Sequence, residues 1–265
     1  MWRFGLVDGP RHEKALLKAK RKLKRKAAAI LPTLFCMSSR KAVPKKTDNT
    51  KTVKSRKSSP AQSTEKPKAD LHGNVAHRVP TALLLIDVIN DLEFPEGQSL
   101  LPEALKMARA IKKLKTRAKA AGIPCIYVND NFGIWQSDFR SVVQHCLEDG
   151  VRGAPLAQML EPEEDDYFVL KPKHSGFYST TLDTLLEYLD AKALIVTGLA
   201  GNICVLFTAN DAYLRDFRLF VPRDCCASNS IEDNKHALEQ MKKVLKADTA
   251  PQAKLDMQAL ARGEF

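Results

Sequence analysis

From residue 80 to the end of the chain, short apolar runs alternate with longer segments in which apolar residues recur at helical spacing. The run 82–86 is wholly apolar and is followed by Asp87, a pattern typical of a strand that is buried on both faces. Pro102 opens a segment whose apolar residues follow at three-residue steps between Lys and Arg, until Gly122 ends it. Strands and helices in this order predict a parallel sheet with helices on both faces.

The expected elements fill the rest of this region. Strands are expected at 82–86, 123–128, 167–170, 193–197 and 219–221, with a weaker sixth at 247–249. Helices are expected from Pro102 to Gly122, from a cap at Ser179 or Thr180 to Leu189, at 202–215 and at 231–245, with one short helix between the second and third strands. The predicted fold class is α/β: a three-layer α/β/α domain with a mostly parallel sheet of about six strands.

Residues 1–79 differ in composition from the rest of the chain. They hold 21 Lys and Arg against 5 Asp and Glu, whereas residues 80–265 hold 21 against 26, so the net charge of +11 comes from the first segment. The stretch 38–76 has almost no large apolar residues and cannot bury enough surface to offset the entropy of ordering it. We predict a basic, Lys/Ser/Pro-rich and largely disordered extension at 1–79 and a folded domain at 80–265.

Two functions are open for the basic extension. Phosphate neutralisation would give salt-sensitive contact with nucleic acid without sequence preference, but the stretch 38–76 contains no aromatic residue to stack on bases. A solvated extension is therefore the favoured interpretation. Met37 is an alternative start, and the basic and apolar stretch 18–37 is an alternative targeting segment, although Pro32 interrupts it.

The cysteines and the hydropathy indicate a compartment. The six cysteines have neither a disulfide framework nor CxxC zinc spacing. No run approaches the roughly 18–20 apolar residues that span a bilayer. We expect a cytoplasmic protein with reduced thiols and no contact with membranes.

Three residues with useful chemistry follow predicted strands. Asp87 ends the first strand, Lys171 ends the third, and Cys204 lies on the turn between the fourth strand and its helix. Ligands of open parallel sheets bind outside the carboxyl ends of the strands, so we expect these side chains to meet there. Each has a plainer explanation alone: a core thiol, a structural cap and a surface lysine. Their joint placement favours a catalytic role.

This set of residues supports nucleophilic catalysis. The start of a helix and a nearby ammonium group both favour the thiolate of Cys204. Asp87 can take the thiol proton and pass it to a leaving amine. The small, flexible turn 198–201 can aim backbone N–H groups at a developing oxyanion.

The motifs around these positions resemble those of the isochorismatase-like cysteine hydrolases, a family that includes the nicotinamidases. They are Leu-Leu-Ile-Asp-Val-Ile-Asn-Asp at 84–91, Lys-Pro-Lys-His-Ser-Gly-Phe at 171–177 and Val-Thr-Gly-Leu-Ala-Gly-Asn-Ile-Cys-Val at 196–205. Segments 208–212 and 224–228 also fit, and the resemblance covers about residues 80–250. It implies a catalytic triad of Asp87, Lys171 and Cys204 and a thioester intermediate.

The resemblance also implies details of the nucleophile turn and of the pocket. It implies a cis peptide bond between Leu199 and Ala200, with the backbone N–H groups of Ala200 and Cys204 as the oxyanion hole. The candidate substrate-pocket residues are Leu92, Trp135, Asp138 and Phe177. Loop packing for Trp135 and a helix cap for Asp138 are equally weighted alternatives. His174 is expected to be an exposed or satisfied histidine without a catalytic role.

One departure from the family pattern bears on the metal requirement and on the class of substrate. Nicotinamidases carry an Asp-x-His metal motif after the second strand, whereas segment 128–139 contains Asp130 and Asp138 but no His. We therefore predict no metal and no other cofactor. Members that hydrolyse the vinyl ether of isochorismate need no cysteine nucleophile, so Cys204 favours amide or ureide substrates.

The sequence therefore predicts a metal-independent cysteine hydrolase of a small amide- or ureide-type substrate. Family habit favours a homo-oligomer. The alternatives are an isochorismatase-type vinyl-ether hydrolase and, from a different class, a nucleic-acid-associated protein that acts through its basic tail.

Overall fold

The computed structural model describes residues 78–133 and 138–265. The expectations for 1–77, which include the disordered extension and the alternative start, lie outside this part of the chain, as does Trp135. No helix within the described part is long and apolar enough to cross a membrane.

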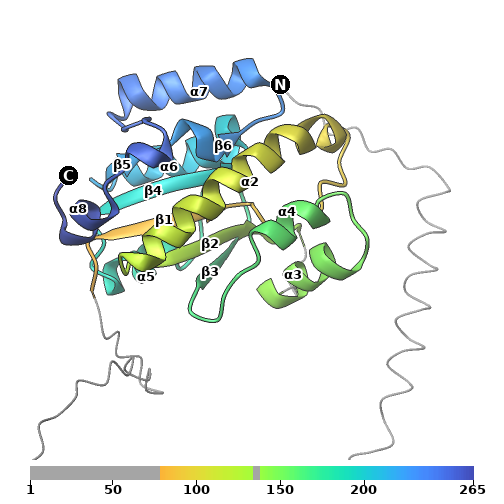
Figure 1. Ribbon diagram of the computed structural model, residues 1–265, viewed down its shortest axis with the longest axis horizontal. Coiled ribbons are helices and arrows are strands. Elements are labelled where there is room, and N and C mark those ends of the chain that lie inside the picture. Colours follow the sequence, from red (N-terminus) through yellow and green to blue (C-terminus); the bar gives the residue numbers. More distant parts are fainter. Residues whose placement is uncertain (1–77, 134–137) are drawn as a thin grey trace, which may run out of the picture. The chain divides into compact units, whose positions relative to one another are not determined.

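Within the described residues, six strands form one sheet, and every pair in it is parallel (Figure 1). They are β1 (Thr81–Ile86), β2 (Cys125–Asp130), β3 (Tyr167–Lys171), β4 (Ala193–Leu199), β5 (Arg218–Phe220) and β6 (Cys226–Ala227). The order is β3-β2-β1-β4-β5, and β6 pairs with the end of β4. The predicted fold class is confirmed.

Helices cover both faces of this sheet. On one face, the core cluster includes residues of α2 (Gly97–Ala120), α3 (Phe139–Glu148), α4 (Ala154–Met159) and α8 (Met257–Arg262). On the other face, it includes residues of α5 (Leu182–Tyr188), α6 (Leu206–Tyr213) and α7 (Ile231–Val244). Leu83 and Leu85 of β1 enter the first cluster, while Leu84 and Ile86 enter the second. This two-sided burial explains why β1 is apolar without alternation.

Three of the expected boundaries are wrong. Helix α2 begins at Gly97, five residues before Pro102, so Pro102 lies inside the helix, and Gly97 and Leu100 of the added turn are buried. The sixth strand is β6, whereas the expected strand at 247–249 makes only a single bridge from Asp248 to Phe220. The expected helix at 202–215 starts as one turn of π-helix (Gly201–Val205) before it becomes α6.

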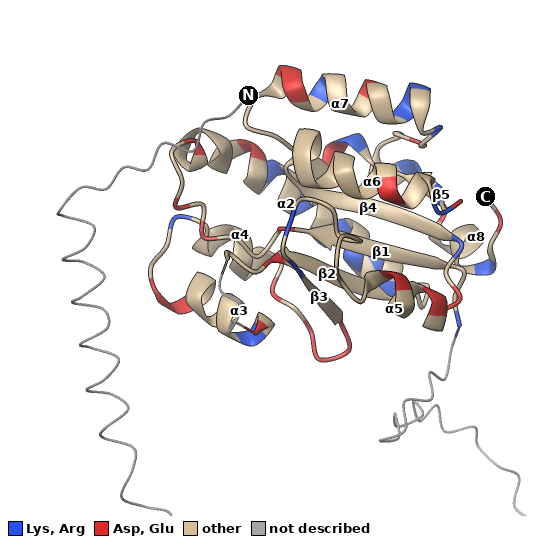
Figure 2. Cartoon of the chain, turned by 180° about the vertical axis from the view of Figure 1, so that it is seen from behind, with Lys and Arg blue, Asp and Glu red and all other residues tan. Residues whose placement is uncertain are grey.

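In the six strands of the described residues, charged side chains lie only at strand ends (Figure 2). Asp130 ends β2, Lys171 ends β3 and Arg218 starts β5. A charge at the carboxyl end of a parallel strand sits where such sheets bind ligands. Two of the three charged strand residues, Asp130 and Lys171, therefore lie at the edge of the sheet where a ligand would bind.

Candidate active site

The strand register brings Asp87 and Lys171 to the same edge. Asp130 is the register partner of Lys171, and Ile86, directly before Asp87, is the partner of Val128. The Asp87 N–H continues the ladder by donating to the Val128 carbonyl at 3.0 Å. The end of β2 thus lies between the two residues and sets their spacing.

Lys171 and Asp87 form a buried ion pair at this edge. Lys171 Nζ lies 2.8 Å from Asp87 Oδ2, with Lys171 wholly buried and Asp87 only 5% exposed. Asp130 supports both partners. Its carboxylate is 3.6 Å from Lys171 Nζ, and its backbone N–H donates to Asp87 Oδ1 at 2.7 Å. Charged groups removed from water need such additional polar contacts.

Cys204 reaches this pair from the turn after β4. Its Sγ lies 3.6 Å from Lys171 Nζ, and it stands on the π-helical turn, an irregularity found often at functional sites. Gly198, at φ 117° near the end of β4, comes just before the turn: a Cβ there would lie 2.0 Å from the Ile86 carbonyl oxygen, so no other residue fits. The peptide bond between Leu199 and Ala200 is cis, as the resemblance implied.

The electrostatics of the three groups bear on one expectation. Burial and the charge of Asp87 raise the pKa of the Cys204 thiol to about 12, and Lys171 only partly opposes them. Burial also raises the pKa of Asp87 against the opposing effect of Lys171. For Lys171 itself, burial lowers the pKa, but Asp87 and Cys204 outweigh it and the pKa is raised. The raised pKa of Cys204 therefore favours a neutral thiol beside the ion pair, against the thiolate that the helix start and the ammonium group favour.

The loop after β3 is tied to the helix that follows Cys204. Ser175 Oγ donates to Asp211 of α6, and the Gly176 N–H donates to Thr208 Oγ1 at 2.9 Å. Thr208 in turn donates to the Cys204 carbonyl at 2.7 Å. The segments 171–177 and 208–212 thus support one another, which fixes Lys171 relative to Cys204.

Of the candidate pocket residues, Leu92 lies in the hydrophobic core. Leu92 is fully buried in the core cluster that includes α2, away from the cluster against which Cys204 packs. Its positive φ of 54° follows an Asx turn in which its own N–H donates to Asn90 Oδ1 at 2.9 Å. That turn directs the side chain into the core, so the expected pocket position of Leu92 is wrong.

The other pocket residues and His174 can also be placed. Phe177 is 5% exposed and packs with Phe217 and the guanidinium of Arg215, which makes it a support of the loop. Asp138 caps α3 by accepting from the Ser141 N–H at 2.8 Å, the alternative weighed for it. His174 is exposed, as expected, yet its Nδ1 lies 3.8 Å from Cys204 Sγ.

The Asp-x-His metal motif of nicotinamidases does not fit the residues at the end of β2. Asp130 is engaged with Lys171, and the position that would carry the imidazole is Phe132, 41% exposed. Across residues 78–133 and 138–265, no group of three or more His, Cys, Asp or Glu side chains is arranged to hold a metal ion. Independence from a metal stays a prediction.

Comparison with known proteins decides the family. Residues 81–250 match the family model described as the isochorismatase domain. The chain belongs to the isochorismatase family. Isochorismatase-family relatives that are hydrolases, amidases among them, establish it as a hydrolase.

Three known proteins illustrate what the chain is similar to. YaaI of Bacillus subtilis, an uncharacterized isochorismatase family protein, is 47% identical over 167 residues, covering 63% of this chain and 91% of YaaI. Ureidoacrylate amidohydrolase RutB of Methylorubrum extorquens is 39% identical over 74 residues, 28% of this chain and 30% of RutB. The crystal structure of N-carbamoylsarcosine amidase from Thermoplasma acidophilum superposes with a TM-score of 0.53 at 26% identity, covering 66% and 98% of the two chains.

Proposed function

We propose that this protein hydrolyses the C–N bond of a small amide or ureide through a thioester on Cys204, without a metal ion. The observation that supports this most is the convergence of three groups. Lys171 Nζ lies 2.8 Å from the Asp87 carboxylate and 3.6 Å from the Cys204 thiol. The names of RutB and of N-carbamoylsarcosine amidase add support, because each is an enzyme that acts on an N-carbamoyl compound.

The reaction begins from the neutral thiol. Asp87 accepts the thiol proton as Sγ attacks the carbonyl carbon, so the costly buried thiolate never accumulates. The raised pKa of Asp87 makes it a better proton acceptor than an ordinary carboxylate. Lys171 stays charged and keeps Asp87 ionised until the proton moves.

The tetrahedral adduct then collapses to a thioester. Its oxyanion is held by the backbone N–H groups of Ala200 and Cys204. Protonated Asp87 gives its proton to the leaving nitrogen, and the C–N bond breaks to release ammonia or an amine. Asp87 next takes a proton from water, which attacks the thioester and frees the carboxylic or carbamic acid together with the thiol.

A panel of small amides and ureides tests this proposal, with ammonia release as the measurement and a chelator added in parallel. Cys204→Ala should lower turnover of every accepted substrate by about 10³-fold or more, as loss of a nucleophile does in other hydrolases. Cys36→Ser removes a thiol outside the family domain and serves as the matched control with unchanged turnover. Full activity in Cys204→Ala would contradict the proposal, as would loss of activity with the chelator. Cleavage of isochorismate alone would favour the vinyl-ether alternative.

A further inference from the structure

The turn that carries Cys204 is held in place by a hydrogen-bonded pair of side chains, Ser228 and Asn234. We call residues 199–205 the nucleophile turn. Within it, the Asn202 N–H donates to Ser228 Oγ at 3.1 Å, and Ser228, directly after β6, is 4% exposed. The Ser228 hydroxyl donates to Asn234 Oδ1 of α7 at 2.9 Å, and Asn234 Nδ2 donates to the Cys226 carbonyl at 3.1 Å. A chain of three hydrogen bonds thus joins the turn to α7 and β6.

The direction of this chain is fixed at both ends. A backbone N–H can only donate, so Ser228 Oγ must accept from Asn202 and give its own proton to Asn234. A backbone carbonyl can only accept, so the amide NH₂ of Asn234 must face Cys226. No other orientation of the Asn234 amide or of the Ser228 hydroxyl satisfies all three bonds. The arrangement therefore holds one position of the turn.

Direct packing against the turn adds to these bonds. A Cβ on Gly201 would lie 2.1 Å from Asn234 Oδ1 and 3.0 Å from Ser228 Oγ. The backbone of the turn therefore lies directly against Ser228, which accepts its hydrogen bond, and against Asn234, which accepts from Ser228. Helix α7 lies close to β6 and α6 at this end of the sheet (Figure 1). The turn can move neither toward α7, because of this contact, nor away from it without breaking the bond to Asn202.

We propose that Ser228 and Asn234 are positioning residues that hold the nucleophile turn in the geometry for attack. This proposal rests on the proposed function. Asn202 lies midway between Ala200 and Cys204, whose N–H groups are the oxyanion donors of the mechanism. A shift of about 1 Å in such groups costs on the order of 100-fold in rate. Neither Ser228 nor Asn234 is part of the ion pair, so both act through the turn alone.

Kinetics of Ser228→Ala, Asn234→Ala and the double variant test the proposal. Each protein is assayed well below its own Tm, with Lys235→Ala, an exposed neighbour on α7, as the matched control. We expect kcat to fall about 10- to 100-fold in each single variant while KM changes by less than about threefold. Because the two residues act as one unit, the double variant should be no slower than the slower single one. Ser228→Thr keeps the hydroxyl and should keep most of kcat.

Asn234→Asp is a further variant for the case in which the alanine variants fail to fold. Asn234→Asp retains the size and the acceptor for Ser228 but places a carboxylate oxygen against the Cys226 carbonyl. It should show the same loss of kcat. Single variants within about twofold of native kcat, or losses that multiply in the double variant, would overturn the proposal.

Amide hydrogen exchange of the segment 199–206 needs no substrate and separates this proposal from the proposed function. Exchange should accelerate in Ser228→Ala and Asn234→Ala and stay unchanged in Lys235→Ala. If the native protein cleaves no amide while exchange accelerates, the proposed function fails and the hold on the turn stands. Unchanged exchange in both alanine variants would overturn the positioning role whatever the substrate.

Discussion

At the scale of residues, Asp87 and Cys204 compete for one cation. Burial raises the pKa of both groups, and the negative charge of Asp87 raises that of the thiol further. Lys171 lies closer to the carboxylate, at 2.8 Å, than to the sulfur, at 3.6 Å. The carboxylate therefore takes the negative charge at rest, and the thiol loses its proton only as it attacks.

The raised pKa of Asp87 predicts the pH dependence of catalysis. An exposed Asp ionises near pH 4, whereas Asp87 takes up a proton at higher pH because burial disfavours its charge. Only the ionised carboxylate can accept the thiol proton, so kcat/KM should fall as pH decreases through this raised pKa. A pH profile of kcat/KM checks it, and an acid limb at or below about pH 4 would be the contrary result.

Removal of the Asp87 charge should raise the reactivity of the Cys204 thiol and at the same time abolish the hydrolysis of substrate. In Asp87→Asn, the repulsion that raises the pKa of Cys204 is gone, so more thiolate forms at a given pH. We expect faster alkylation of Cys204 by iodoacetamide together with loss of hydrolysis. Mass spectrometry of the peptide with Cys204 measures the rate separately from the other thiols. Slower alkylation than in the native protein would contradict the claim that the charge of Asp87 keeps the thiol protonated at rest.

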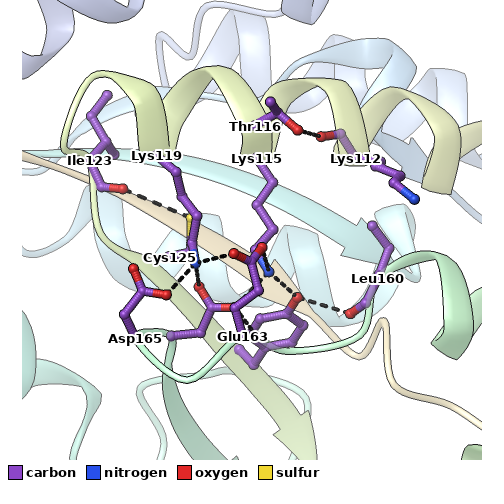
Figure 3. A network of polar contacts seen from close by, with 11 residues as sticks. Lys112, Lys115, Thr116, Lys119, Ile123, Cys125, Leu160, Glu163 and Asp165 are labelled. Atoms are coloured by element: carbon purple, nitrogen blue, oxygen red, sulfur yellow. Dashed lines mark hydrogen bonds and ion pairs between the residues drawn. The ribbon is translucent and has the colours of Figure 1, made fainter.

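At the scale of elements, a polar network joins α2 to the segment before β3 at the other end of the sheet. Lys115 Nζ, on a side chain 7% exposed, lies 2.6 Å from Asp166 Oδ2, and Lys119 Nζ lies 3.0 Å from Asp166 Oδ1. Figure 3 shows Lys115 and Lys119 reaching from α2 toward Glu163 and Asp165. The side chain of Asp166 is 1% exposed, so its removal leaves a nearly buried ammonium short of a partner.

Loss of that carboxylate should therefore destabilise the domain. Asp166→Ala should lower the free energy of unfolding by roughly 3–5 kcal/mol, the usual effect of breaking a buried ion pair. Glu103→Ala removes the carboxylate of an exposed pair with Lys106 on the same helix and should cost under about 1 kcal/mol. Urea unfolding measures both variants. Equal losses in the two would show that the burial of Asp166 is unimportant.

The elements also show what the sequence could predict. Asp87, Lys171 and Cys204 were predictable because each follows a strand whose apolar pattern is clear. The support from Asp130 was not, since it depends on the register that pairs Asp130 with Lys171. Strand β6 is two residues long, which is too short for a periodic pattern. The hydrogen bond from the nucleophile turn to Ser228 could therefore not be predicted from the sequence.

Two features of the site have local causes of the same kind. The inward direction of Leu92 depends on the Asx turn at Asn90 and on a positive φ that no apolar pattern reveals. The protonation of Cys204 depends on how deeply the thiol is buried, which spacing along the chain does not give. Both properties arise only when the chain is folded.

At the scale of the whole molecule, the family domain at 81–250 contains every residue assigned to catalysis or to positioning the turn. The basic segment 1–79 contributes none of them. Deletion of residues 1–79 should therefore leave kcat and KM of an accepted amide within about twofold of the full chain, because no assigned residue is removed. Steady-state kinetics at matched salt measures this. A large loss would show that the segment takes part in catalysis.

The partners of the chain stay predictions at this scale. Nucleic-acid binding is not favoured, and binding that survives deletion of 1–79 would show that the tail is not its source. The expected homo-oligomer is checked by light scattering of the full chain. Neither result changes the chemistry assigned to Cys204.

Trapping of the thioester tests the central claim most directly. An accepted amide is mixed with the protein, quenched in acid within milliseconds to seconds, and the peptides are weighed by mass spectrometry. We predict an added mass equal to the acyl group on the peptide with Cys204, removable by hydroxylamine as a thioester is and absent in Cys204→Ala. Hydrolysis at full rate with no acyl group on Cys204 at any quench time, or with Cys204 replaced, would contradict the account.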